Sequence, residues 1–332
     1  MRFMRKLLFV ITLFSGQILF SQTVEKGVKH AGQHMGRGHR FTFLEFLLSP
    51  KFILMLIIAA VALILLLTKK MKKSFKISLL LISTFLFGLL QNIPGDFFSN
   101  FAMHPSPMCA STKPLLYGLR IPFMVTLFVI FLLTLIGPKL FCSYVCPIGA
   151  VQELVTMLGD KLKIKRYKFS FRLAYGIRMG LLILFLCISA TAIIYVITPN
   201  GRMIPKSIYD YLNAFHGFEF EIQEGLIENI FHYLPFILTL ILAIKIYRPF
   251  CHFVCPVGIY AHCLEQMSLF RVTLKKNSCT DCNICIEKSP CTAMTDILKD
   301  SNLRPDCYAC NVCVESCPEK ALIIGTRTTL QK

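Results

Sequence analysis

The sequence contains no tryptophan and few acidic residues, with 18 Asp and Glu against 36 Lys and Arg in 332 residues. Charged residues make up only 16% of the chain, whereas 55% is hydrophobic and the mean hydropathy is +0.61. This composition is too apolar for a soluble protein of this size, and the apolar residues occur in blocks. Basic loops beside those blocks account for the net charge of +18, so we expect no nucleic-acid partner.

Several kinds of catalytic or binding site are missing from the sequence. There is no C-x-x-C-H haem-attachment motif, no glycine- and lysine-containing loop that would cradle phosphate, and no arrangement of a nucleophile with an acid or base. We therefore predict a redox subunit of a larger oxidoreductase system rather than a self-contained enzyme.

Five apolar blocks are each long enough, or nearly so, to cross the hydrocarbon core of a bilayer. They cover residues 52–67, 77–93, 121–137, 179–198 and 230–247. Residues 1–21 combine basic residues with an apolar run, which indicates a signal peptide or a sixth span. Residues 22–51 would then be a periplasmic segment, and residues 52–272 a transmembrane domain.

The distribution of basic residues predicts the topology of these spans. Five lysines lie in residues 68–76 and eight basic residues lie in 138–178, whereas the 94–120 loop has two and the 199–232 loop is mostly acidic. Because cytoplasmic loops carry excess Lys and Arg, we predict a multi-pass protein of the bacterial inner membrane, in contact with its lipids. Everything after Arg248 would be cytoplasmic, where thiols stay reduced and free for metals.

Near the C-terminus, four cysteines form the run C-x-x-C-x-x-C-x-x-x-C-P, which is typical of a ligand set for a [4Fe–4S] cluster. A second run lies upstream, although five residues separate its last two cysteines and Thr292 stands where proline is usual. In such pairs the fourth cysteine of each run binds the other cluster. The predicted ligands are Cys279, Cys282, Cys285 and Cys317 for cluster 1, and Cys307, Cys310, Cys313 and Cys291 for cluster 2.

The spacing distinguishes this arrangement from a zinc knuckle, in which two C-x-x-C pairs stand farther apart. We expect residues 273–326 to form a small α+β ferredoxin-like domain with two clusters. The predicted fold class is therefore an all-α polytopic membrane protein with five spans, plus a signal peptide or sixth span, followed by this domain.

An internal repeat lies upstream of the ferredoxin-like motifs. Residues 141–149 read F-C-S-Y-V-C-P-I-G, and residues 250–258 read F-C-H-F-V-C-P-V-G. If the helix of the span continued through the motif, each pair of thiols would lie on one helix face. We expect amphipathic helices on the membrane surface to follow each motif. Cys142, Cys146, Cys251 and Cys255 could then hold a third cluster or a soft metal such as copper.

Two C-x-x-x-C-P motifs at the ends of spans, followed by two ferredoxin-type motifs, resemble the membrane polyferredoxins of the NapH/NosR type. The resemblance covers residues 121–324, and residues 146–153 are similar to the longer family signature. It implies iron–sulfur electron transfer between the quinone pool or a cytoplasmic donor and a periplasmic or membrane redox partner. That partner would be a nitrate or nitrous oxide reductase, or its maturation system.

Weaker candidate ligands lie in the segment expected outside the membrane. His30, His34, Met35 and His39 stand in a glycine-rich stretch and could bind copper, although a flexible basic linker explains them as well. His216 and His232 could contact a quinone headgroup. Two other functions remain open. The chain could be a copper-reducing or metal-handling assembly factor for a cuproenzyme, or a membrane redox sensor.

Overall fold

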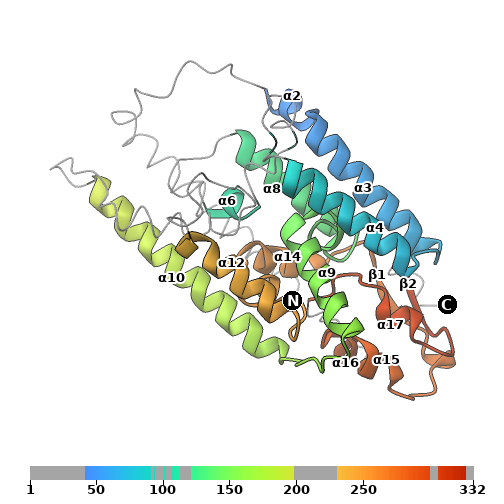
Figure 1. Ribbon diagram of the computed structural model, residues 1–332. Helices are drawn as coiled ribbons and strands as arrows, with labels where there is room; N and C mark the ends of the chain where they lie inside the picture. The colour runs from blue at the N-terminus through green and yellow to red at the C-terminus, as the bar shows by residue number, and fades with distance from the viewer. Residues whose placement is uncertain are drawn as a thin grey trace.

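The computed structural model describes residues 42–90, 93, 101, 107–112, 121–197, 230–299 and 306–326. The predicted leader at 1–21 and most of the 22–51 segment lie outside the described residues. The described chain is mostly helical and has few strands (Figure 1). Its longer helices are α3 (Pro50–Leu67), α4 (Lys73–Thr84), α8 (Ile121–Ile136), α9 (Pro147–Lys161), α10 (Phe171–Ile197) and α12 (Ile230–Ala243).

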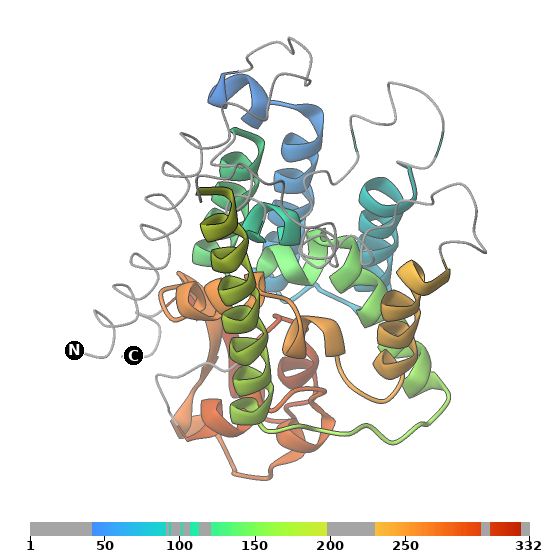
Figure 2. The ribbon, with the colours of Figure 1, turned by 90° about the vertical axis from the view of Figure 1, so that its left-hand side faces the viewer.

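A bundle of apolar helices makes up half of the molecule. Helices α3, α4, α8, α10 and α12 run roughly alongside one another, and the C-terminal segment gathers at one end of them (Figure 2). Helix α4 continues through a π-helical turn, η1 (Phe85–Leu89). Proline at the first position of α3 suits a helix start, because the N–H that proline lacks has no partner there.

Helices occupy all five predicted apolar blocks, but only two are long and apolar enough to cross a membrane on their own. Among the described residues these are Pro50–Leu67 and Phe171–Ile188, and Ile121–Ile136 and Leu234–Ala243 are apolar but shorter. The prediction of five spans is therefore supported in part, and the number of crossings stays a prediction.

The outer faces of the bundle carry large hydrophobic side chains. Each of these helices has several exposed side chains of the large apolar types. Examples are Ile57 on α3, Leu81 on α4, Phe128 on α8, Leu181 on α10 and Leu238 on α12. Contiguous apolar surface of this kind is rare on monomeric soluble proteins and marks a membrane or protein contact.

The C-terminal segment forms a small α+β unit, as the sequence predicts. Strand β1 (Phe270–Leu274) pairs antiparallel with β2 (Leu322–Thr326), so that Val272 lies opposite Ile324. The chain between the strands forms η5 (Lys276–Ser278), α15 (Ile284–Lys288), α16 (Ala293–Leu298) and α17 (Val312–Glu315). Val272, Leu322 and Ile324 are buried and pack in one core with the cysteines between the strands.

The end of the bundle that meets this unit carries the basic loops. After α3, the Met71 carbonyl accepts from Asn311 Nδ2 at 3.4 Å. After α8, Lys139 pairs with Asp306, and near the start of α10 Arg178 Nη2 lies 3.4 Å from the same carboxylate. The loops predicted to be cytoplasmic and the C-terminal unit thus lie at the same end.

Helices α9 and α14 (Val257–Glu265) follow the two repeat motifs. All nine residues of α14 are buried, so the prediction that this helix lies on the membrane surface is wrong. Helix α9 is buried on one side, where Gln152 bonds to Phe250 and Glu153 bonds to Arg248. It exposes Leu158, so its position at the membrane surface stays a prediction.

We expect Glu153→Gln to destabilise the protein by about 3–5 kcal/mol, because two buried cations would lose their counterion. Glu153 accepts from Lys76 Nζ at 2.5 Å and from Arg248 Nε at 2.7 Å, and the Glu153 side chain is 4% exposed. Asp160→Asn is the matched control, since the Asp160 side chain is 42% exposed and the change should cost about 0–1 kcal/mol. Thermal unfolding of the purified variants checks this; equal Tm values would contradict it.

Candidate iron–sulfur centres

The two C-x-x-x-C-P motifs share a left-handed backbone turn, which follows the end of α8 at Ile136 and of α12 at Ala243. Lys139 and Arg248 stand three residues before the first cysteine of each motif, and φ is 47° at each. A left-handed residue cannot continue a right-handed helix. The first cysteines therefore lie on separate turns, η3 (Phe141–Val145) and α13 (Pro249–Phe253). The helices before the motifs therefore do not continue through them, and each pair of thiols does not lie on one face of such a helix.

The turns bring four thiols together. Burial and the nearby thiols of Cys146, Cys251 and Cys255 raise the pKa of Cys142 well above its ordinary value. Burial raises the pKa of Cys146 and of Cys255 to about 12, and Cys251 contributes to both. Thiolates this close are unfavourable without a cation between them, and a metal centre provides that charge.

Glycine allows close packing in both motifs. A Cβ at Gly149 would lie 2.3 Å from the Cys142 carbonyl oxygen, and one at Gly258 would lie 2.6 Å from Arg178 Nη1. The backbone N–H of Gly149 faces the Cys146 thiol, and that of Gly258 faces the Cys255 thiol. N–H groups in this position stabilise a thiolate.

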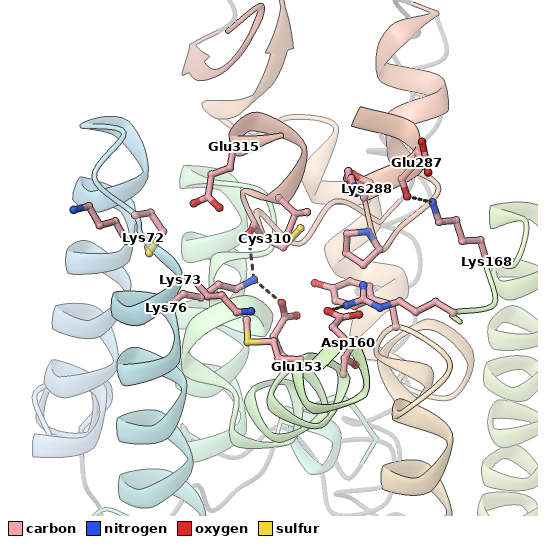
Figure 3. A pocket seen from close by; sticks show the side chains of 18 of the residues that line it. Lys72, Lys73, Lys76, Glu153, Asp160, Lys168, Glu287, Lys288, Cys310 and Glu315 are labelled. Carbon is pink, nitrogen blue, oxygen red and sulfur yellow. Dashed lines mark hydrogen bonds and ion pairs between the residues drawn. The ribbon is translucent and has the colours of Figure 1, made fainter. Parts of the chain in front are cut away.

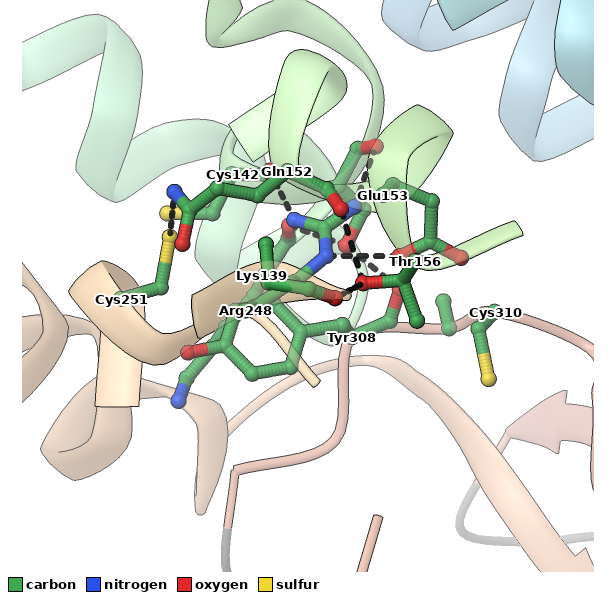
Figure 4. A network of polar contacts seen from close by, with 12 residues as sticks. Lys139, Cys142, Gln152, Glu153, Thr156, Arg248, Cys251, Tyr308 and Cys310 are labelled. Carbon is green, nitrogen blue, oxygen red and sulfur yellow. Dashed lines mark hydrogen bonds and ion pairs between the residues drawn. The ribbon is translucent and has the colours of Figure 1, made fainter. Parts of the chain in front are cut away.

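A buried arginine holds the first cysteine of each motif through its carbonyl oxygen. Arg248 Nη1 donates to Cys142 at 2.6 Å, and Arg178 Nη1 donates to Cys251 at 2.9 Å. Gln152 Nε2 also lies 3.5 Å from the Cys251 sulfur (Figure 4). The two motifs therefore share a hydrogen bond as well as a sequence pattern: in each, an arginine donates to the carbonyl of the first cysteine.

Two buried carboxylates neutralise the cations around these motifs. Burial alone would raise the pKa of Asp306, but Lys139 and Arg178 outweigh it and hold the pKa well below the usual range. Lys76 and Arg248 do the same for Glu153. Because both pKa values are lowered on folding, the stabilisation is fully present above the ordinary carboxyl pKa and is lost only in strong acid.

Cys279, Cys282, Cys285 and Cys317 line one small cavity of the C-terminal unit. Burial is the main cause that raises the pKa of Cys285, and the nearby thiols of Cys317 and Cys282 raise it further. The Ala321 N–H donates to Cys317 Sγ at 3.3 Å. The structure thus places together the four residues predicted for cluster 1.

Cys291, Cys307, Cys310 and Cys313 form a second group. Burial raises the pKa of Cys313 well above its ordinary value, with further contributions from Cys310, Cys307 and Cys291. The five residues between Cys285 and Cys291 contain the end of α15 and a turn at Ser289 and Pro290. These residues accommodate the irregular spacing, and Cys291 still reaches the other run.

Both C-x-x-C-x-x-C loops have the same pattern of left-handed residues around the middle cysteine. Asp281 and Asn283 flank Cys282 with φ of 52° and 58°, and Ala309 and Asn311 flank Cys310 with φ of 46° and 66°. Left-handed residues in such loops turn successive N–H groups toward one point, which forms a concavity for anions and iron–sulfur clusters. The thiols and the backbone both fit such clusters.

The third centre and the cluster 2 loop are hydrogen-bonded to each other. Ser143 Oγ donates to the Tyr308 carbonyl at 2.5 Å, and Tyr144 Oη donates to the Ala309 carbonyl at 2.8 Å. The Tyr308 ring packs against Phe250 and Cys251 in a cluster that also includes Cys142, Cys146, Cys255, Cys291 and Cys310.

Sequence reasoning missed Tyr308, Asp306 and Arg178, and it treated Lys139 only as a topology signal. The Lys139 Nζ lies 4.7 Å from the centre of the Tyr308 ring, and the Lys139 side chain is fully buried. A signal was available for Lys139, since Lys139 and Arg248 occupy the same position in the repeat. Nothing local singles out the other three residues.

The side chains of the remaining candidate ligands lie outside the part of the chain that the structure describes. His30, His34, Met35, His39 and His216 lie outside the described residues, and so does the side chain of His232. Within the part of the chain that the structure covers, no three His, Cys, Asp or Glu side chains form a group that could hold a metal ion. In a [4Fe–4S] cluster each thiolate binds a different iron, so its ligands stand farther apart than those of one ion.

Comparison with protein families places iron–sulfur binding on the repeat. Residues 119–165 and 229–277 match the family described as a 4Fe-4S binding domain. Each matched segment contains one C-x-x-x-C-P motif with the whole of the helix before it, α8 or α12, and the helix after it. Both segments end before Cys279.

Several curated proteins are about a quarter identical to this chain over segments that cover roughly half of it. "Putative electron transport protein YccM" of Escherichia coli (strain K12) is 26% identical over 175 residues, which are 50% of this chain and 45% of that protein. "Methylamine utilization ferredoxin-type protein MauN" of Methylobacillus flagellatus is 26% identical over 157 residues, covering 47% and 50%. "Uncharacterized protein MJ0749" of Methanocaldococcus jannaschii is 25% identical over 173 residues, covering 50% and 57%.

The chain therefore spans about half the length of these relatives. No solved structure is significantly similar to it. These three names do not mention nitrate or nitrous oxide, so the specific NapH/NosR resemblance stays a prediction. The comparisons show that the two C-x-x-x-C-P segments are similar to a 4Fe-4S binding domain, and the structure brings the four cysteines of these segments together.

Proposed function

We propose that this protein is a membrane-bound electron carrier with three [4Fe–4S] sites. The observation that carries the proposal is the grouping of twelve cysteines into three sets of four, with the repeat set bonded to the cluster 2 loop. A cluster of this type supplies one-electron redox chemistry at a fixed position. The names of YccM and MauN, which specify electron transport and a ferredoxin-type protein, support the same reading.

The chain's own residues would hold these centres at constant separation and keep water away. Ser143 and Tyr144 fix the cluster 2 loop against the repeat. Tyr308 is 2% exposed and fills the space between the two sets of thiols. Hydrogen bonds to sulfur and burial are the features through which a protein sets the potential of such centres.

The bundle would place the clusters beside the cytoplasmic face of the membrane. Its exposed apolar faces suit lipid, and its basic loops meet the C-terminal unit at one end. Electrons would pass between this end and the quinone pool or a cytoplasmic donor, and onward to a periplasmic respiratory reductase or its maturation system. A nitrate or nitrous oxide reductase is the partner that the sequence resemblance favours.

Protein purified without oxygen should contain about twelve iron atoms per chain, or about eight if the repeat cysteines hold no cluster. Cys251→Ser should remove about four irons, and Cys313→Ser should remove the EPR signal of one cluster. Cys263→Ser is the control, since Cys263 is buried but belongs to none of the three sets.

Two results would contradict this assignment. A colourless protein containing zinc would exclude the electron carrier. Copper bound stoichiometrically to the wild type and lost in Cys251→Ser would favour the metal-handling alternative.

Gly149→Ala should prevent the binding of one cluster and so remove about four irons per chain. The Cβ of the new alanine would collide with the Cys142 carbonyl oxygen and displace the turn. Gly180→Ala is the matched control, because a Cβ there meets nothing within 4 Å. Iron analysis of both variants checks the prediction. An unchanged iron content in Gly149→Ala would mean that the Cys142 turn holds no cluster.

The topology has a separate test. A reporter active only in the cytoplasm should work when it is fused after Lys332 and fail when it is inserted beside Glu221, because the loop charges place these positions on opposite sides. Equal activity at both positions would rule out the proposed orientation.

A further inference from the structure

A basic cavity of about 660 Å³ lies between the helical bundle and the cluster domain. Its walls come from the start of α4, from one face of α9, from the 165–168 loop, and from the segments around α15 and α17 (Figure 3). The volume falls in the range of sites for small molecules.

The cavity carries more positive than negative charge. Seven basic and four acidic side chains line it. Lys76 and Arg166 are neutralised by Glu153 and Asp160. Among the described residues, the side-chain ammonium groups of four lysines form no hydrogen bond or ion pair: Lys72, Lys73, Lys165 and Lys288. Lys288 lies in the cluster domain and not in a loop between spans. The excess of basic residues that orients membrane spans therefore does not account for its positive charge.

Two further features are suited to a phosphate. No side chain caps the N-terminus of α4, and the first turn of this helix, which lines the cavity, has no acidic residue. Free N–H groups and the helix dipole favour an anion at that position. Ser289 also lines the cavity and is 1% exposed, and its hydroxyl is buried in the wall without a hydrogen-bond partner. Rotation about the Cα–Cβ bond of Ser289 would be needed before this hydroxyl could donate to a phosphate.

The cavity reaches cluster 2. Cys310 lines it, and Lys76 Nζ donates to the Cys310 carbonyl at 3.1 Å. The apolar part of the cavity wall is formed by Met71, Met157 and Tyr247. We propose that this cavity binds a soluble phosphorylated molecule of nucleotide size next to cluster 2. This binding site is an addition to the proposed electron relay. Ligand binding can be measured without electron transfer, so the two proposals can be tested separately.

Equilibrium dialysis of the intact, anaerobically purified protein tests the site with two probe pairs, FMN against riboflavin and AMP against adenosine. The members of each pair differ only by a phosphate. At least one phosphorylated probe should bind at least about tenfold more tightly than its unphosphorylated partner, as expected for a charge-assisted contact. The double variant Lys165→Gln, Lys288→Gln should weaken that binding by about tenfold and leave the unphosphorylated probe unaffected.

The control double variant is Lys161→Gln, Lys275→Gln. It removes the same charge from exposed positions outside the cavity, so binding should not change. Three outcomes would overturn the proposal: neither phosphorylated probe binds, both members of each pair bind equally, or the cavity variant binds as the wild type does. Binding that is lost in phosphatidylglycerol nanodiscs but kept in phosphatidylcholine nanodiscs would also overturn it, by identifying a lipid headgroup as the occupant.

Discussion

The arrangement of the cysteines depends on buried ion pairs that join the helical bundle to the cluster domain. Asp306 immediately precedes Cys307 and pairs with Lys139 and Arg178, both fully buried and both on the bundle side. Glu153 similarly links Lys76 to Arg248. Loss of one partner would leave a charge buried without compensation, which proteins tolerate poorly. The network therefore fixes the relative position of two units whose interface would otherwise be free to shift.

Duplication explains how two distant segments bring four thiols together at the proposed third centre. Each C-x-x-x-C-P unit supplies two thiols, a proline that starts the next helix and a glycine that admits a close neighbour. The arginine that fixes the first cysteine comes from elsewhere in both cases, Arg248 for Cys142 and Arg178 for Cys251. Neither unit is complete alone. The match of both segments to a 4Fe-4S binding domain agrees with a shared centre.

The three sets of thiols and the basic cavity suggest an order for the centres. The thiols assigned to cluster 1 lie beside α15. Of the thiols assigned to cluster 2, Cys291 and Cys310 pack in the same cluster of side chains as the repeat set. The cavity opens beside Cys310, the middle cysteine of cluster 2. A soluble ligand bound there would reach the relay at its centre, while the repeat set would remain available to a partner in the membrane.

The sequence by itself determined the local features of this protein. The cysteine spacings indicated the crossed sets, and the apolar blocks indicated the helices, because both patterns are read within a few turns of chain. Only the tertiary structure decided that Lys139 is a buried partner of Asp306, that Tyr308 lies between two centres, and that α14 is packed inside. It also formed the cavity beside Cys310 from segments that are far apart in the sequence. These features depend on contacts between residues far apart in the chain, and no local pattern encodes which distant charge or carbonyl will meet a given side chain.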